Sequence, residues 1–218
     1  KNLIGLKNLK NKIDLKSYPS IEAQIASISD DIAYNNHDIQ DGFNANIFRI
    51  NELKEINFFN EILKRYSSKF KKTNNRILIY QMVRDSINLM VKDLIKNSLI
   101  NFKLNKINKL NDVYKSENKL VCFSSNYENI INEIRDFLSF KMYKNNKVLK
   151  KNNEGRRIIE KLFKAISRNP RKFLTFSTNK HNKYRSIADY ISGMTDRFAI
   201  NIYKSLKWIY LKNIKINY

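Results

Sequence analysis

The chain has 218 residues, of which 42% are hydrophobic, and carries a formal charge of +22 from 42 basic and 20 acidic side chains. This length and apolar content exclude a disordered tail and allow one large or two small domains around a buried core. The presence of only 4 Gly and 2 Pro favours long helices over many short strands. The single cysteine, Cys122, excludes an internal disulfide. With no apolar run long enough to span a bilayer, we expect a cytoplasmic protein that does not bind a membrane.

The positive charge has two interpretations. Lys outnumbers Arg by 31 to 11, and Asn and Ile are also abundant. Such a bias is typical of A+T-rich coding, and we expect the charge to be spread evenly rather than gathered in one patch. The alternative is selected binding of an anion, which is compatible with a nucleotide substrate or with nucleic acid as a partner.

The first predicted helix covers about residues 20–40. Pro19 breaks any preceding helix, Ser20 is a typical N-cap, and Glu22 lies in the first turn. Isoleucines at helical spacing form one apolar stripe: Ile21, Ile25, Ile28 and Ile32. The opposite side carries small residues, two carboxylates and an aromatic ring: Ala23, Ser27, Asp30, Tyr34 and Asp38. We therefore expect two faces suited to close packing.

The carboxylates of this second face allow two interpretations. If they are buried, a metal ion, a ligand hydroxyl or a basic side chain must satisfy them; otherwise the face is simply exposed to solvent. The neighbouring Asp31 reads as an ordinary surface acid. A complete metal site is not predicted within this chain, because His37, His181 and Cys122 are far apart in the sequence.

The later apolar periodicities predict further helices and an all-α, multi-helical fold. Helices are expected over 51–66, 76–102 and 125–143, in a segment that ends before Pro170, and in a last segment whose stripe runs from Ile187 to Phe198. The polar segment 105–119 is expected to be a loop or a short hairpin, and 177–185 a polar loop.

Two motifs in this order resemble one enzyme family. The stretch EAQIASISDDIAYNNHDIQDG, residues 22–42, resembles the last metal-binding helix of the deoxyguanosine triphosphate triphosphohydrolase-like branch of the HD-domain phosphohydrolases. The stretch RSIADYISGMTDRFA, residues 185–199, is similar to the C-terminal signature of that family. Three segments between them follow the family's order: MVRDSINLMVKDLI, FLSFKMY and GRRIIEKLFKAISRNP. The resemblance covers about residues 14–206.

The resemblance implies an all-α C-terminal part of such a phosphohydrolase. Residues 1–45 would be the last segment of the HD domain, and 46–218 the phosphohydrolase-associated helical domain. The family hydrolyses a deoxynucleoside triphosphate to the deoxynucleoside and triphosphate, using a divalent metal ion (Mg, Mn or a transition metal). By position, Asp30 matches the final metal ligand, Tyr34 the residue that packs against deoxyribose, and Asp38 the residue that binds its 3′-hydroxyl.

The resemblance also implies what this chain lacks. The family's other ligands and its catalytic His would lie before Lys1, so that this chain holds no catalytic residue. We expect it to be inactive without a missing N-terminal half and to belong to a homo-oligomer. Phe43 and Asn44 stand where relatives commonly carry Leu and Arg, which implies a lost basic contact.

Other roles stay open at this point. Gly193 is expected on a helix with Asp189, Asp196 and Arg197. The glycine could allow another helix to approach closely, or the charged residues could stabilise the helix by ion pairs. Alternatively, these residues act at the site or at a subunit interface. A rival interpretation of the whole chain is a basic helical module that binds nucleic acid. A third is a non-catalytic subunit that binds nucleotide or forms oligomers.

Overall fold

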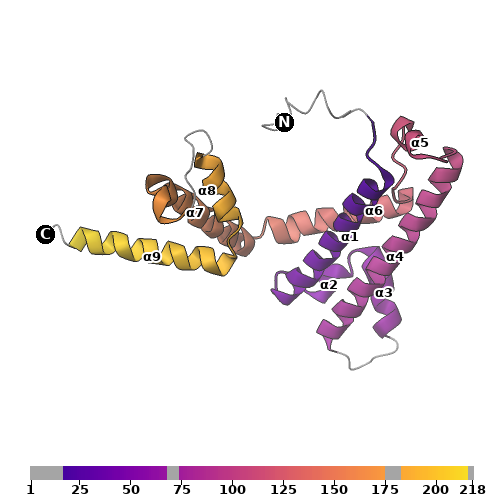
Figure 1. Cartoon of the computed structure of the whole chain (residues 1–218). Helices are drawn as coiled ribbons and strands as arrows, with labels where there is room; N and C mark the ends of the chain where they lie inside the picture. The colour runs from indigo at the N-terminus through magenta and orange to yellow at the C-terminus, as the bar shows by residue number, and fades with distance from the viewer. Residues whose placement is uncertain (1–16, 68–73, 175–182, 216–218) are drawn as a thin grey trace. The chain divides into compact units, whose positions relative to one another are not determined.

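The computed structural model describes residues 17–67, 74–174 and 183–215. Within these ranges all regular structure is helical, which confirms the all-α prediction. The chain divides into two compact units, Lys1–Asn145 and Asn146–Tyr218, which are considered separately (Figure 1). The predicted boundary after residue 45 concerns the domains of the family and stays a prediction.

Helix α1 (Ile21–Asn44) begins where the sequence predicts. The Ser20 side chain accepts a hydrogen bond from the backbone N–H of Ala23, and the helix runs four residues beyond the expected end. The predicted apolar stripe is wrong at one position, because Ile25 is 46% exposed. Gln24 takes the buried place instead, and the buried side continues through Ile28 and Ile32. A polar residue is buried here because its amide has backbone partners.

Gln24 ties α1 to the non-helical segment that precedes α6 (Ser125–Leu138). Its Oε1 accepts hydrogen bonds from the backbone N–H groups of Leu120 and Val121, both at 3.2 Å, and its Nε2 donates to the Pro19 carbonyl at 2.9 Å. Asn101 on α4 donates to the Leu120 carbonyl at 3.1 Å. The glutamine of the Glu-Ala-Gln motif is therefore structural: it satisfies two buried donors that no helix or sheet would satisfy.

Replacing Gln24 by Ala is expected to lower the free energy of unfolding by about 2 kcal/mol, because two buried N–H groups lose their acceptor. Urea unfolding followed by circular dichroism measures the change. The matched control is Gln40→Ala on the same helix, where the half-buried side chain is expected to matter by less than about 0.5 kcal/mol. Equal destabilisation by both variants would contradict the structural role of Gln24.

The first unit contains five further α-helices and one π-helical turn among its described residues. They are α2 (Ile50–Leu53), α3 (Asn57–Ser67), α4 (Asn75–Leu104), α5 (Leu110–Lys115), α6 (Ser125–Leu138) and the π-turn η2 (Ser139–Tyr143). The predicted helices at 76–102 and 125–143 are confirmed, the second as α6 followed by η2. Within this unit α1 runs along α4, α3 also packs on α4, and α6 packs on α1 (Figure 1).

Two further predictions for this unit are wrong. The segment 51–66 is not one helix, because the chain turns between α2 and α3. There the Glu55 and Ile56 N–H groups bond to carbonyls only three residues back, and the tighter turn buries Ile56. The segment 105–119 is neither a plain loop nor a hairpin, because it contains α5. Asp112 stabilises the start of α5 by accepting hydrogen bonds from two backbone N–H groups.

The core of the first unit joins α1, α2, α3, α4 and α6. Its most deeply buried side chains are Ile39, Leu53, Phe59, Ile79, Met82, Met90 and Leu138. Burial of each such side chain contributes about 1.5–3 kcal/mol. This core fixes the inner side of α1, and so determines which residues of α1 face outward.

The second unit is formed by α7 (Asn146–Arg168), a 3₁₀ turn (Pro170–Lys172), α8 (Lys183–Ser192) and α9 (Asp196–Lys215). Its core consists of Leu162, Ile166, Ile187, Ile191 and Ala199. The end of α7 before Pro170 is confirmed. Residues 183–185 belong to α8, so the polar loop predicted to reach residue 185 is wrong there. The remainder of that prediction, from 177 to 182, lies outside the described residues.

The last predicted helix is wrong as a single element, because Gly193 lies in the turn between α8 and α9. A Cβ at Gly193 would lie 3.6 Å from the Asp189 carbonyl oxygen, an ordinary contact, so no described neighbour requires glycine by close approach. Asp189 forms an ion pair with Arg185 at 2.8 Å. Thr195 caps α9. A role for Arg197 at a site or interface stays a prediction.

Among the helices of the described residues, none has the length and apolarity required to cross a membrane.

Candidate functional site

The three predicted site residues share the outer face of α1. Asp30, Tyr34 and Asp38 follow at intervals of four residues, which places each about 6 Å along the axis from the next. Asp30 is exposed and Tyr34 is 57% exposed, whereas Asp38 is half-buried. The structure gives the Asp30 carboxylate no ion pair within the described ranges. The second face of α1 is therefore open around Asp30, where the expected close packing is not found among the described residues.

A tyrosine from a distant part of the sequence meets two of these residues. The hydroxyl of Tyr143 donates a hydrogen bond to Asp38 Oδ2, and its ring centroid lies 6.4 Å from that of Tyr34. Burial, followed by the contacts with Asp38 and Tyr34, raises the pKa of Tyr143 well above its usual range. The hydroxyl therefore stays protonated at physiological pH and remains a donor. Tyr34, Asp38 and Tyr143 form one cluster, which we call the tyrosine–aspartate cluster.

The π-turn η2 determines the position of Tyr143. The Lys144 N–H bonds to the Ser139 carbonyl five residues back, at 3.2 Å, where an α-helix would bond four residues back. Lys141 anchors the turn through an ion pair with Glu52 at 2.8 Å. Glu52 also accepts a hydrogen bond from the Arg49 N–H. The ion pair raises the pKa of Lys141 and lowers that of Glu52. Single π-turns of this kind are frequent at functional sites.

Sequence reasoning missed Tyr143. The resemblance gives the segment FLSFKMY, in which Tyr143 lies, only a place in the order of motifs, and its apolar spacing does not indicate a functional tyrosine. Asp31, by contrast, behaves as the surface acid that the sequence predicts, because it is exposed and pairs with Arg135 of α6 at 3.1 Å. Asp30 and Asp31 are adjacent in sequence but face different surroundings.

The described residues do not form a complete metal site. No three His, Cys, Asp or Glu side chains gather anywhere in the described part of the chain. His37 is exposed on α1, and His181 lies outside the described residues. Cys122 is half-buried, and its sulfur accepts from the Asn101 amide at 3.2 Å. A divalent cation could take one oxygen of Asp30, but the set does not fit a complete site.

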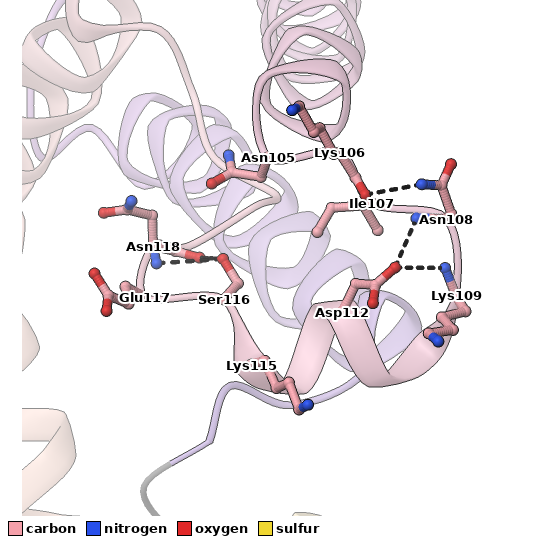
Figure 2. A pocket seen from close by; sticks show the side chains of 10 residues that line it. All are labelled: Asn105, Lys106, Ile107, Asn108, Lys109, Asp112, Lys115, Ser116, Glu117 and Asn118. Atoms are coloured by element: carbon pink, nitrogen blue, oxygen red, sulfur yellow. Dashed lines mark hydrogen bonds between the residues drawn. The ribbon is translucent and has the colours of Figure 1, made fainter.

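An open hollow of about 730 Å³ lies beside α5, away from these residues in the sequence. Its lining is almost entirely polar: Asn105, Lys106, Ile107, Asn108, Lys109, Asp112, Lys115, Ser116, Glu117 and Asn118 (Figure 2). Figure 2 shows that the Asp112 carboxylate is occupied by the backbone N–H groups of Asn108 and Lys109. The polar groups that line this hollow form hydrogen bonds within the surrounding turns. None of the predicted site residues lines it.

Comparison with known proteins links this arrangement to a family. The profile of the "Phosphohydrolase-associated domain" matches residues 121–205. The "Deoxyguanosinetriphosphate triphosphohydrolase-like protein" of Pelagibacter ubique is 56% identical over 204 residues, which are 94% of this chain and 55% of that protein. The protein of the same name from Rickettsia typhi is 37% identical over 91% of this chain and 53% of its own length. The chain belongs to this triphosphohydrolase-like family.

Membership in the triphosphohydrolase-like family confirms the resemblance inferred from the two motifs. The chain spans about half the length of the curated relatives it matches. The phosphohydrolase-associated match begins at Val121, whose N–H is held by Gln24. It includes Tyr143 but not α1. In this family member, the tyrosine–aspartate cluster therefore joins a residue inside the associated domain to residues that precede it.

Proposed function

We propose that this chain is the C-terminal half of a deoxynucleoside triphosphate triphosphohydrolase, in which α1 closes the active site. The reaction converts a deoxynucleoside triphosphate and water to the deoxynucleoside and triphosphate. In this proposal Asp30 is the last metal ligand, and Tyr34 and Asp38 bind the sugar. The names of the relatives and the position of the predicted residues on one open face support it.

The tyrosine–aspartate cluster is the observation that carries the proposal. Asp38 Oδ2 accepts the Tyr143 hydroxyl hydrogen, and a carboxylate has acceptor capacity left on its second oxygen. A substrate hydroxyl can donate to that oxygen. The half-exposed ring of Tyr34 lies beside it and offers a flat apolar surface. A hydrogen-bond acceptor of fixed orientation next to an aromatic ring suits a deoxyribose with a free 3′-hydroxyl.

Asp30 lies about 12 Å along the helix from Asp38, on the part of the face that is open. As an exposed carboxylate it can give one oxygen to a divalent ion, and the remaining ligands must come from residues outside the described set. When bound, such an ion polarises a phosphate oxygen and lowers the pKa of a bound water. The contribution of this chain is to hold the sugar end of the substrate and to supply that single ligand.

The test is a chimera of the Pelagibacter relative in which this chain replaces the matched residues, since the two are 56% identical. We expect the parent and the chimera to release triphosphate from a deoxynucleoside triphosphate in the presence of a divalent metal, and the isolated 218-residue chain to release none. An active parent with an inactive, folded chimera would contradict the proposal. Binding of nucleotide by both without hydrolysis would favour the non-catalytic alternative.

In the chimera, Asp38→Asn is expected to lower kcat/KM by about tenfold to a hundredfold, because a charge-assisted hydrogen bond to the substrate contributes about 1.5–3 kcal/mol. The loss should appear mainly in KM, since the 3′-hydroxyl is remote from the reacting phosphate. Steady-state assays of triphosphate release measure it. Asp136→Asn, an exposed acid on α6, is the control and should leave kcat/KM unchanged.

A further inference from the structure

Charge is not evenly distributed over the helices, which corrects the expectation drawn from composition. Helix α1 carries five acidic residues and no Lys or Arg among its 24 residues. Helix α7 carries eight basic and two acidic residues among its 23. A coding bias acting on the whole chain does not explain such a difference between two helices of nearly equal length. The basic residues of α7 therefore require a separate explanation.

Part of the basic charge of α7 lies on one side of the helix. Lys150, Arg157, Lys161 and Lys164 follow at spacings of seven, four and three, which repeat the helical period. All four are exposed, whereas the apolar side of α7 is buried in the core of its own unit. We call these four residues the α7 basic stripe.

The acidic residues of α7 do not neutralise the stripe. Glu160 pairs with Arg156 at 3.0 Å, and Glu154 pairs with Lys151 at 3.7 Å. Both basic partners lie outside the stripe. Glu154 lies between Lys150 and Arg157 along the helix, where its charge is offset by its ion pair with Lys151. The structure gives none of the four stripe residues an acidic partner within the described ranges.

We propose that the α7 basic stripe binds the phosphate backbone of a nucleic acid strand. Its cations lie in a line about 21 Å long from Lys150 to Lys164, which suits an extended chain of phosphates better than one compact triphosphate. A membrane surface is a poorer match, because a helix that binds lipid keeps its apolar side free, and that side of α7 packs on α8 and α9. The proposal rests on α7 alone and does not depend on the proposed hydrolase activity.

The test uses the full 218-residue chain and a fluorescent oligothymidine of about 20 nucleotides, with anisotropy measured from about 50 to 300 mM salt. Wild type is expected to bind with a log–log salt slope that reflects at least three phosphate contacts, about −2. The variant Lys150→Gln/Lys161→Gln/Lys164→Gln should lose most of that slope and bind at least about tenfold more weakly at 100 mM salt. Circular dichroism checks that it remains folded.

The matched control removes the same charge from α4: Lys92→Gln/Lys96→Gln/Lys103→Gln, three lysines that are also exposed. Its affinity is expected to stay within about twofold of wild type at 100 mM salt.

Equal weakening by both variants would overturn the proposal, because binding would then follow net charge alone. Absence of binding by wild type would also overturn it, as would displacement of the oligonucleotide by tripolyphosphate at equal phosphate concentration. Binding to phosphatidylserine vesicles without binding to the oligonucleotide would assign the stripe to a membrane instead.

Discussion

Replacement of Asp30 by Ala is expected to abolish metal-dependent triphosphate release by the chimera, with a loss of at least about a thousandfold. A catalytic metal contributes several kcal/mol of transition-state stabilisation, and each 1.36 kcal/mol is a factor of ten in rate. Asp30 is exposed on α1 and has no ion pair within the described ranges, so its removal should cost little stability. The rate of triphosphate release and the metal content of the purified protein, measured by mass spectrometry, report the two effects.

The neighbouring residue provides the matched control for this prediction. Asp31→Ala removes the same charge one position along the helix, and it breaks only the exposed ion pair with Arg135. Exposed pairs of this kind contribute about 0–1 kcal/mol, so we expect unchanged activity and metal content. If Asp30→Ala keeps the activity of the chimera, or if Asp31→Ala loses as much, Asp30 is not a ligand and the proposed function of α1 is wrong.

The second large effect is expected from a single methyl group at Gly42, near the end of α1. A Cβ at this position would lie 2.5 Å from Cζ of Phe48, well inside van der Waals contact. Phe48 cannot yield easily, because it is buried and packs edge-to-face on Phe137 at 5.1 Å between centroids. Gly42→Ala should therefore lower the free energy of unfolding by about 3 kcal/mol through overpacking.

Gly155 in α7 gives the opposite expectation for the same substitution. A Cβ there would meet no atom within 4 Å, so Gly155→Ala should raise the free energy of unfolding by about 0.5–1 kcal/mol through helix propensity. Urea unfolding of the two variants measures both. Because the chain has two compact units, each transition should be followed by a probe in its own unit. Stabilisation by Gly42→Ala would contradict the close packing of Phe48 against α1.

The local signals in the sequence predict the beginning of α1 well. A helix breaker, a hydroxyl cap and an acid in the first turn act within four residues, and Ser20 caps the helix as expected. The exposed Ile25 and the buried Gln24 could not be predicted in this way. Their environment is determined by Leu120 and Val121, almost a hundred residues later. Periodicity describes one helix at a time, whereas burial depends on what packs against it.

In the candidate site, too, local spacing predicts some residues, whereas contacts between distant parts of the sequence determine others. Asp30, Tyr34 and Asp38 are found on one face because helical spacing alone places them there. Tyr143 is 105 residues from Asp38, and it reaches the carboxylate through a π-turn, which no apolar period in the sequence indicates. The break at Gly193 cannot be predicted from periodicity either, because the apolar spacing continues across the turn between α8 and α9.

The π-turn has a consequence for insertions and deletions. A π-turn is equivalent to one extra residue within an α-helix, and here it follows the buried Leu138 and ends at Tyr143. Deleting Phe140 would remove that extra residue and leave the later residues in register, whereas deleting the exposed Asn132 from the regular part of α6 would rotate Tyr143 by about 100° relative to the buried Ile131. Tyr143 would then lose its contact with Asp38 although no residue of the cluster had been replaced. In this part of the molecule the length of the chain, as much as its composition, selects the partner of Asp38.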